Sequence, residues 1–149
     1  MLGMKGLCFH KQRVWILGVK QENNERDDSV DPPNLSLWTT TPDGSLTLTS
    51  QVGYPPPVTS KIQDFVGFAD ELFTFTDNGM FIFNITFRRW YRHNVNNIRP
   101  PQIIRNSVAR WYNKLVCHHD NATYMWDPQL NYWIPLPGLF HTLLLFSIS

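Results

Sequence analysis

Two stretches of the sequence share one pattern: residues 70–83 read DELFTFTDNGMFIF, and residues 113–126 read NKLVCHHDNATYMW. When they are aligned without a gap, most apolar positions of the first face an apolar residue of the second, at an offset of 43 residues. The match continues without insertion as far as residues 94 and 137. A fixed offset over this length indicates a structural unit that the chain uses more than once.

Each copy has the pattern of a hairpin that is followed by one more strand. The turn between the two apolar runs reads Asp-Asn-Gly in one copy and Asp-Asn-Ala in the other. Asn and Gly accept the positive φ angles of tight turns, and the Asp side chain can bond the backbone two residues on. An extended run also precedes each hairpin. The expected strands are 64–69, 72–76 and 80–85 in one copy and 106–112, 115–119 and 123–127 in the other. A tryptophan follows each set at the same position of the repeat, Trp90 in one copy and Trp133 in the other.

A fainter copy opens the chain. Matching Val14 with Leu72 gives an offset of 58, which exceeds 43 by 15, and the excess falls in the polar insert KQENNERDDSVDPP at 20–33. The first copy is therefore predicted to be the same unit with a longer loop. Its strands are expected near 6–10, 13–19, 35–39 and 45–50.

Composition agrees with many short strands. The chain has 149 residues, enough for one domain, with 42% hydrophobic, 14% aromatic and only 17% charged residues, besides 11 prolines and 8 glycines. A four-stranded unit of roughly 40 to 50 residues that cannot bury both faces alone is typical of a β-propeller blade. We therefore predict an all-β fold, an incomplete β-propeller of about three four-stranded antiparallel blades at 5–51, 61–95 and 104–137, with an atypical apolar tail at 139–149.

The third copy suggests a family. Its run NSVARWYNKLV, the turn HDN and then ATYMWDPQLNYWIPLP resembles a kelch repeat, with an acidic residue at the end of the third strand (Asp127) and a tryptophan shortly after it. The resemblance covers about residues 5–137. It lacks the glycine pair of that family, so a diverged propeller of another type is the rival interpretation. The resemblance implies a non-enzymatic protein-binding module and a role as the substrate-recognition part of a ubiquitin-ligase adaptor. The two cysteines cannot form a disulfide framework, so we expect a reducing compartment, the cytoplasm or the nucleus.

Three blades do not close a ring, because propellers typically have four to eight. The sequence leaves three explanations open: the chain is a piece or splice form of a larger propeller, it associates with other chains, or it keeps open blade edges that favour self-association. We expect the first.

The resemblance also implies where a partner binds, since kelch propellers usually meet partners on the loops between second and third strands and on the linkers between blades. These loops vary without cost to the core. The protein-partner residues predicted in this way are Asp77, Asn78, Arg92, Arg99, Arg105, Asp120 and Asn121.

An alternative is single-stranded nucleic-acid binding. Residues 78–119 contain no acidic residue and seven cations, and two Arg-Trp-Tyr triplets combine charge with rings that stack on bases. The structural interpretation, which we favour, is that Trp90 is a blade tryptophan and that the arginines lie over the aromatic rings or in loops. A second alternative is a fragment of a catalytic propeller.

No cofactor, metal or membrane partner is expected. The run His118-His119-Asp120 is the only cluster that resembles a metal site, but neighbouring strand residues point to opposite faces, so it would need a bulge. Cys117 is expected to be a core residue. Sequons at Asn34, Asn84 and Asn121 arise readily by chance in such a chain, and no apolar run is long enough to cross a bilayer.

Overall fold

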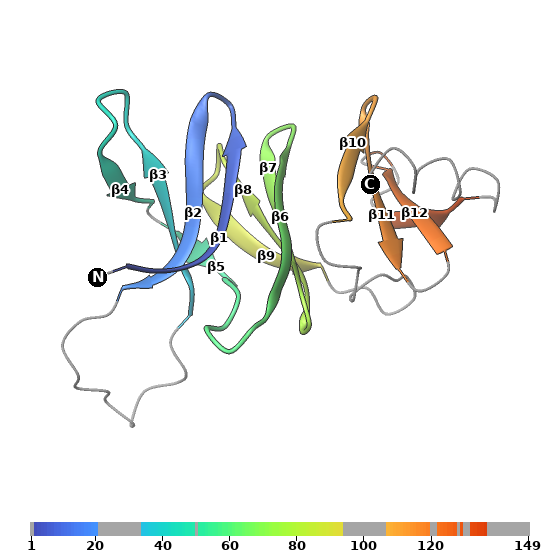
Figure 1. Cartoon of the computed structure of the whole chain (residues 1–149), viewed down its shortest axis with the longest axis horizontal. Helices are drawn as coiled ribbons and strands as arrows, with labels where there is room; N and C mark the ends of the chain where they lie inside the picture. The colour runs from blue at the N-terminus through green and yellow to red at the C-terminus, as the bar shows by residue number, and fades with distance from the viewer. Residues whose placement is uncertain are drawn as a thin grey trace.

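The fold consists of three β-sheets that stand side by side (Figure 1). The computed structural model describes residues 2–20, 34–49, 51–93, 107–119, 122–127, 129 and 132–136. Within these residues there is no helix, and so none that could span a membrane. The predicted all-β class and the three antiparallel units are confirmed, whereas the polar insert and the tail at 139–149 lie outside the described residues.

The first sheet is an antiparallel meander whose strands follow chain order. Its first hairpin turns on Lys11 and Gln12, which both have positive φ, 52° and 59°, as a two-residue turn between twisted strands requires. Ala69 and Tyr112, the residues that correspond to Lys11 in the later sheets, also have positive φ, 53° each. The strands are β1 (Leu2–His10), β2 (Arg13–Lys20), β3 (Ser36–Thr40) and β4 (Leu46–Leu48).

The second sheet has one strand more than predicted. The two-residue strand β5 lies in the linker and pairs in parallel with the outer strand β9. At Gly53 φ is +102°, and a Cβ there would come 1.9 Å from the Trp90 carbonyl oxygen, so only glycine fits. The strands are β5 (Val52–Gly53), β6 (Ile62–Phe68), β7 (Glu71–Thr76), β8 (Gly79–Asn84) and β9 (Arg89–His93), in the order β5-β9-β8-β7-β6.

The third sheet repeats the register of the second. Leu115 pairs with Trp126 as Leu72 pairs with Phe83, 43 residues earlier. The same offset relates the outer pairs of the two sheets. The repeat seen in the sequence is therefore a repeat of hydrogen-bonded pairs. The strands are β10 (Ala109–Trp111), β11 (Lys114–His119), β12 (Ala122–Asp127) and β13 (Tyr132–Pro135).

The first sheet follows the same plan with the longer loop in the predicted place. Trp15 pairs with Thr39, as Phe73 pairs with Ile82. Phe73 lies 58 positions after Trp15, whereas Ile82 lies 43 positions after Thr39. The first sheet therefore has 15 more residues between β2 and β3 than the second sheet has between β7 and β8. The insert therefore adds residues between β2 and β3 and leaves the pairing register unchanged.

The second sheet is buried on both faces. From Leu72 to Thr76 every residue of β7 is buried, because alternate side chains enter different cores. One core lies between the first and second sheets and holds Trp90; the other lies between the second and third sheets and holds Trp133. Each tryptophan faces the sheet that precedes its own, so the predicted equivalence of the two is confirmed. The buried residues are Trp15, Leu17, Leu35, Leu37, Phe65, Leu72, Phe81, Phe83 and Trp90 in the first core and Phe68, Phe73, Phe75, Met80, Ile82, Leu115, Cys117, Trp126 and Trp133 in the second.

Candidate functional site

Three of the predicted partner-binding residues meet at one end of the second sheet. Asp77 and Asn78 form the β7–β8 turn, and Arg92 comes from β9 beside them. The Arg92 Nη2 atom donates to the Asn78 carbonyl oxygen over 2.6 Å, and its guanidinium carbon lies 5.7 Å from the centre of the Phe81 ring. The other four predicted residues, Arg99, Arg105, Asp120 and Asn121, lie outside the described residues.

The turn itself is built by short-range bonds. The Thr76 hydroxyl donates to the Gly79 carbonyl oxygen over 2.9 Å and accepts from the Asn78 amide over 3.0 Å. Gly79 has φ +117°, which L side chains rarely adopt. Gly79 thus has the positive φ expected of the Asp-Asn-Gly turn, whereas Asn78 does not. Asp77 Oδ1 accepts from the Lys61 amide and not from the backbone two residues on, and Thr76 supports the turn in its place.

The linker before β6 lies against this turn. The Lys61 amide donates to Asp77 Oδ1 over 2.8 Å, and the Asp77 amide donates to the Lys61 carbonyl oxygen over 3.2 Å. Asn78 Nδ2 lies 3.4 Å from the Ser60 hydroxyl. We call this group of residues the loop-end surface: Ser60, Lys61, Asp77, Asn78 and Arg92.

Sequence reasoning missed the roles of Ser60 and Lys61, although it placed their linker on the same face. No local pattern pairs a linker amide with a carboxylate 16 residues later. On the loop-end surface Lys61, Asn78 and Arg92 are exposed, Asp77 is half-buried and Ser60 is buried. The surface therefore offers two cations and an amide to a partner, while a hydrogen bond from the Lys61 amide engages the Asp77 carboxylate.

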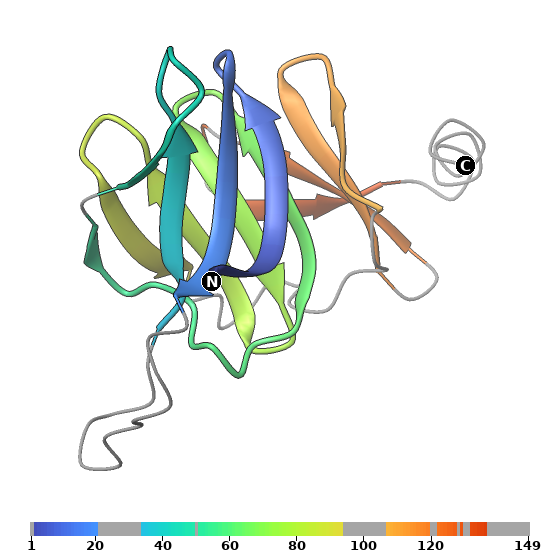
Figure 2. The same cartoon turned by 60° about the vertical axis from the view of Figure 1, so that its left-hand side comes forward.

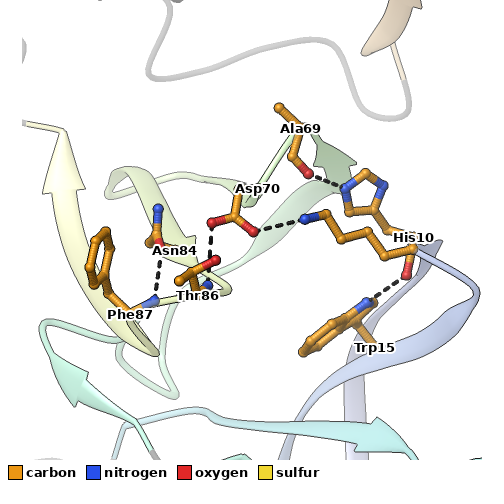
Figure 3. Close-up of polar contacts among 8 residues, drawn as sticks. His10, Trp15, Ala69, Asp70, Asn84, Thr86 and Phe87 are labelled. Carbon is orange, nitrogen blue, oxygen red and sulfur yellow. Dashed lines mark hydrogen bonds and ion pairs between the residues drawn. The ribbon is translucent and has the colours of Figure 1, made fainter.

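At the opposite end of the molecule, polar contacts join the first and second sheets (Figure 3). His10 Nε2 lies 2.6 Å from the Ala69 carbonyl oxygen, which can only accept, so this nitrogen carries the proton. Lys11 Nζ lies 2.8 Å from Asp70 Oδ1, and the Thr86 amide donates to Asp70 Oδ2 over 3.4 Å. The hydrogen bond from the Lys11 side chain, and then that from the Thr86 side chain, lowers the pKa of Asp70. These contacts hold two hairpin turns in a fixed relation.

The basic stretch of the sequence does not form one continuous surface in the described residues. Arg89 and Arg92 lie toward opposite ends of β9, and Arg110 donates to the Gly67 carbonyl oxygen over 2.7 Å. Lys114 Nζ lies 3.6 Å from Asp127 Oδ1. The Trp90 ring is fully buried, so the first Arg-Trp-Tyr triplet has no indole that could stack on a base.

Neither cysteine is placed as a nucleophile. Cys117 is fully buried and Cys8 is half-buried. Burial, and secondarily the charge of Asp64, raises the pKa of Cys8 to about 12 and raises that of Cys117 further. The thiolate is the reactive form, so both thiols are held in their unreactive state.

The run that resembled a metal site shows no bulge in its strand. The pairs made by Cys117, His118 and His119 with β12 follow one another without a register shift, so positions 118 and 119 alternate between faces. His118 is buried. Asp120 lies outside the described residues, which contain no group of three or more His, Cys, Asp or Glu residues that could hold a metal ion.

An open cavity of about 230 Å³ lies where the first strands of the three sheets approach one another. Its walls are mainly apolar, and its charged residue is Arg110, which already bonds to Gly67. Representative lining residues are Cys8, Phe65, Gly67, Val108, Arg110 and Leu115.

Comparison with models of protein families gives no match, and comparison with curated proteins gives no significant match.

Proposed function

We propose that the chain is part of a β-propeller of kelch type and serves as a non-enzymatic protein-binding module. Three antiparallel sheets that repeat one register and pack face to face support this proposal. So does the repeated tryptophan, which in each of the last two sheets faces the preceding sheet. In this proposal the three sheets are consecutive blades, and the glycine pair that kelch repeats usually carry is replaced by other turn residues.

The observation that carries the functional part is the loop-end surface. Arg92 is exposed yet held by the Asn78 carbonyl oxygen, and the neighbouring linker is bonded to the same turn. A preordered cation loses less conformational entropy on binding than a free one. We propose that this surface binds an acidic segment of a protein partner, together with the other predicted residues Arg99, Arg105, Asp120 and Asn121.

The wider role proposed from the kelch resemblance is substrate recognition in a ubiquitin-ligase adaptor, in the cytoplasm or nucleus. It rests on the resemblance alone. The alternative of nucleic-acid binding has less support, because Trp90 is buried and the basic side chains of the described residues are dispersed. For the alternative of a fragment of a catalytic propeller, the two cysteines offer no nucleophile, because burial raises both cysteine pKa values.

The test compares two arginines of the same strand. Partner capture from cell extract, identified by mass spectrometry, is carried out with the unchanged chain, with Arg92→Ala and with the matched control Arg89→Ala, whose side chain is exposed near the other end of β9. We expect Arg92→Ala to lose proteins that Arg89→Ala retains. The deficit of Arg92→Ala relative to the unchanged chain should be largest at low salt and should shrink as salt rises, since exposed charges are screened beyond about 8 Å at physiological ionic strength.

Thermal melting of both variants should match that of the unchanged chain, so that lost capture reports binding rather than unfolding. If Arg92→Ala captures the same proteins across the whole salt series, the loop-end surface is not the binding site. A single-stranded oligonucleotide that binds the unchanged chain, and whose affinity falls equally in both variants, would instead favour the nucleic-acid alternative.

A further inference from the structure

The loop-end surface contains an asparagine that is followed by a glycine, Asn78-Gly79, the single Asn-Gly pair in the sequence. Asn78 is exposed in the β7–β8 turn, which Figure 2 shows at the lower end of the second sheet, beside the linker that precedes β6. The side-chain amide of an asparagine can be attacked by the backbone nitrogen of the next residue, and a glycine there has no side chain to shield this nitrogen. The pair therefore has the composition that deamidation requires.

The side chain of Arg92 contacts the peptide group that would carry out the attack. Arg92 Nη2 donates to the Asn78 carbonyl oxygen over 2.6 Å. This oxygen belongs to the same peptide group as the Gly79 nitrogen, so it takes up negative charge when that nitrogen loses its proton. A cationic donor at the oxygen stabilises this anion in the way that an oxyanion hole does. Arg92 therefore favours the ionised, attacking form of the Gly79 nitrogen.

The remaining contacts of the turn leave the reacting groups accessible. A Cβ at position 79 would lie 3.5 Å from Arg92 Nε and 3.6 Å from Arg92 Nη2, so the guanidinium lies directly along the glycine. The leaving group, Asn78 Nδ2, has only a long contact of 3.4 Å with the Ser60 hydroxyl. Gly79 pairs with Thr76 at the end of the β7–β8 ladder, next to the turn, where local opening costs least.

We propose that Asn78 is a site of spontaneous deamidation that Arg92 assists. The Gly79 nitrogen forms a bond to Asn78 Cγ, the bond from Cγ to Nδ2 breaks, and Nδ2 leaves as ammonia with the proton that the Gly79 nitrogen has lost. Water then adds to either carbonyl carbon of the cyclic imide, the bond from that carbon to the Gly79 nitrogen breaks, and the nitrogen regains a proton. The product is an aspartate or an isoaspartate, depending on the carbon attacked.

The modification changes the charge of the loop-end surface. It places a carboxylate at position 78, whose own carbonyl oxygen is already bonded to Arg92. The new carboxylate competes for the Arg92 cation and repels an acidic segment. This consequence rests on the proposed function, in which the surface binds such a segment. Deamidation then lowers the affinity of the loop-end surface for an acidic partner as the protein ages, without an enzyme.

Other asparagines of the same chain serve as internal comparisons. Those within the described residues precede residues with long or branched side chains, which shield the backbone nitrogen, and they are Asn34, Asn84 and Asn113. Asn84 Oδ1 in addition accepts from the Phe87 amide over 2.9 Å. Asn78 should therefore react before all three.

Peptide mapping by mass spectrometry, with a separation that distinguishes aspartate from isoaspartate, follows this reaction in the whole folded chain at neutral pH. Arg92→Ala should slow conversion of Asn78 about 10-fold, less than the 10²–10³-fold cost of removing a donor from a buried oxyanion hole, because this site is exposed. Arg92→Lys, which keeps a cation, should recover part of the rate. The matched control is Arg89→Ala, near the other end of β9, which should leave the rate unchanged.

Two outcomes of this experiment overturn the proposal. If Arg92 only held the turn together, Arg92→Ala would deamidate as fast as the unchanged chain or faster, and its assistance would be refuted. If Asn78 stays intact in the folded chain over a period in which the urea-unfolded chain converts, the turn protects the amide and the site itself is refuted.

A second experiment tests the consequence, with a synthetic polyglutamate peptide as the acidic probe. Asn78→Asp, which carries the charge of the deamidated chain, should bind the probe about 2- to 5-fold more weakly than the unchanged chain at low salt, the loss expected for one exposed charge pair. Asn113→Asp adds the same charge in the β10–β11 turn and should bind like the unchanged chain.

The outcomes separate this consequence from the proposed function. Equal binding by Asn78→Asp and the unchanged chain refutes the effect of deamidation on the surface. If the unchanged chain does not bind the probe, the proposed function fails and the consequence fails with it, whereas the deamidation measured at Asn78 stands.

Discussion

The imidazole of His10 lies against the backbone of Gly67, so closely that a Cβ at position 67 would come 2.1 Å from the His10 Cγ. On the carbonyl side of the same residue, Arg110 Nη2 donates to the Gly67 oxygen over 2.7 Å. Strand β6 is thus contacted at one residue by the sheet before it and by the sheet after it. The absence of a side chain at position 67 allows the first and second sheets to approach.

Replacement of Gly67 by Ala should therefore loosen the first interface. The clash is with the Cβ and Cγ of His10, and the Cβ, 2.4 Å away, is fixed by the backbone and cannot swing away. Overpacking of this kind costs about 1–3 kcal/mol of unfolding free energy, measured by chemical denaturation. Gly3→Ala is the control, since a Cβ there would lie 3.6 Å from the Val19 carbonyl oxygen, an ordinary contact. His10→Ala combined with Gly67→Ala should recover part of the loss; a Gly67→Ala chain as stable as the original would refute the proposed clash.

Trp90 and Trp133 should contribute similarly to stability, because each fills the core between its own sheet and the preceding one. Either change to Ala is expected to lower the free energy of unfolding by about 3–5 kcal/mol. Tyr112→Ala, at a ring that is 83% exposed, should have little effect in the same denaturation experiment. A large effect at one tryptophan and none at the other would show that the two interfaces are not equivalent.

The two thiols should react slowly in the folded chain. With the pKa of Cys8 raised to about 12 and that of Cys117 also raised, thiolate is scarce at pH 8. Labelling by a chromogenic disulfide reagent should therefore be slow in buffer and fast in denaturant. Because both pKa values are raised, titration of these thiols should not alter stability below pH 8. Rapid labelling of the folded chain near neutral pH would contradict this prediction.

Asp64 should introduce a pH dependence of stability that runs opposite to that of Asp70. Burial raises the pKa of Asp64, although bonds from the Val108 and Phe65 amides partly offset it. Between the ordinary value of about 3.9 and the raised one, the folded chain binds more protons than the unfolded chain. The contribution of Asp64 to stability therefore falls as pH rises through that window and is constant above it.

Denaturation midpoints of Asp64→Asn and of the unchanged chain, compared from acid to neutral pH, check this sign. The variant should gain stability relative to the unchanged chain as pH rises. Asp70→Asn is the control with the opposite sign. The lowered pKa of Asp70 gives the unchanged chain stability that is present above about pH 3.9 and is lost as pH falls through the pKa of the folded state. Asp70→Asn should therefore become less stable relative to the unchanged chain as pH rises. Parallel curves for both variants would mean that neither carboxylate titrates differently on folding.

The sequence repeat was sufficient to predict the three sheets, because one register recurs at 43 residues in the last two sheets and with 15 extra residues in the first, which leaves the same apolar pattern in each copy. It did not predict β5, since a two-residue strand has no periodicity of its own. Nor did it predict the contact of His10 with Gly67, which joins strands 57 positions apart and requires knowledge of how two sheets pack. In the candidate site, turn chemistry identified Asp77 and Asn78, while the bond to Lys61 depends on the path of the linker.

Strand β5 has a consequence for how the chain behaves when concentrated. The amides of Val52 and Tyr54 donate to the carbonyl oxygens of Arg88 and Trp90, over 3.2 Å in each case. These acceptors lie on the rim of β9, where a strand from a foreign molecule would otherwise add and begin a fibrillar stack. By running its own connection along that rim, the chain removes this template, so a strand of only two residues protects the β9 edge of the sheet from sideways growth.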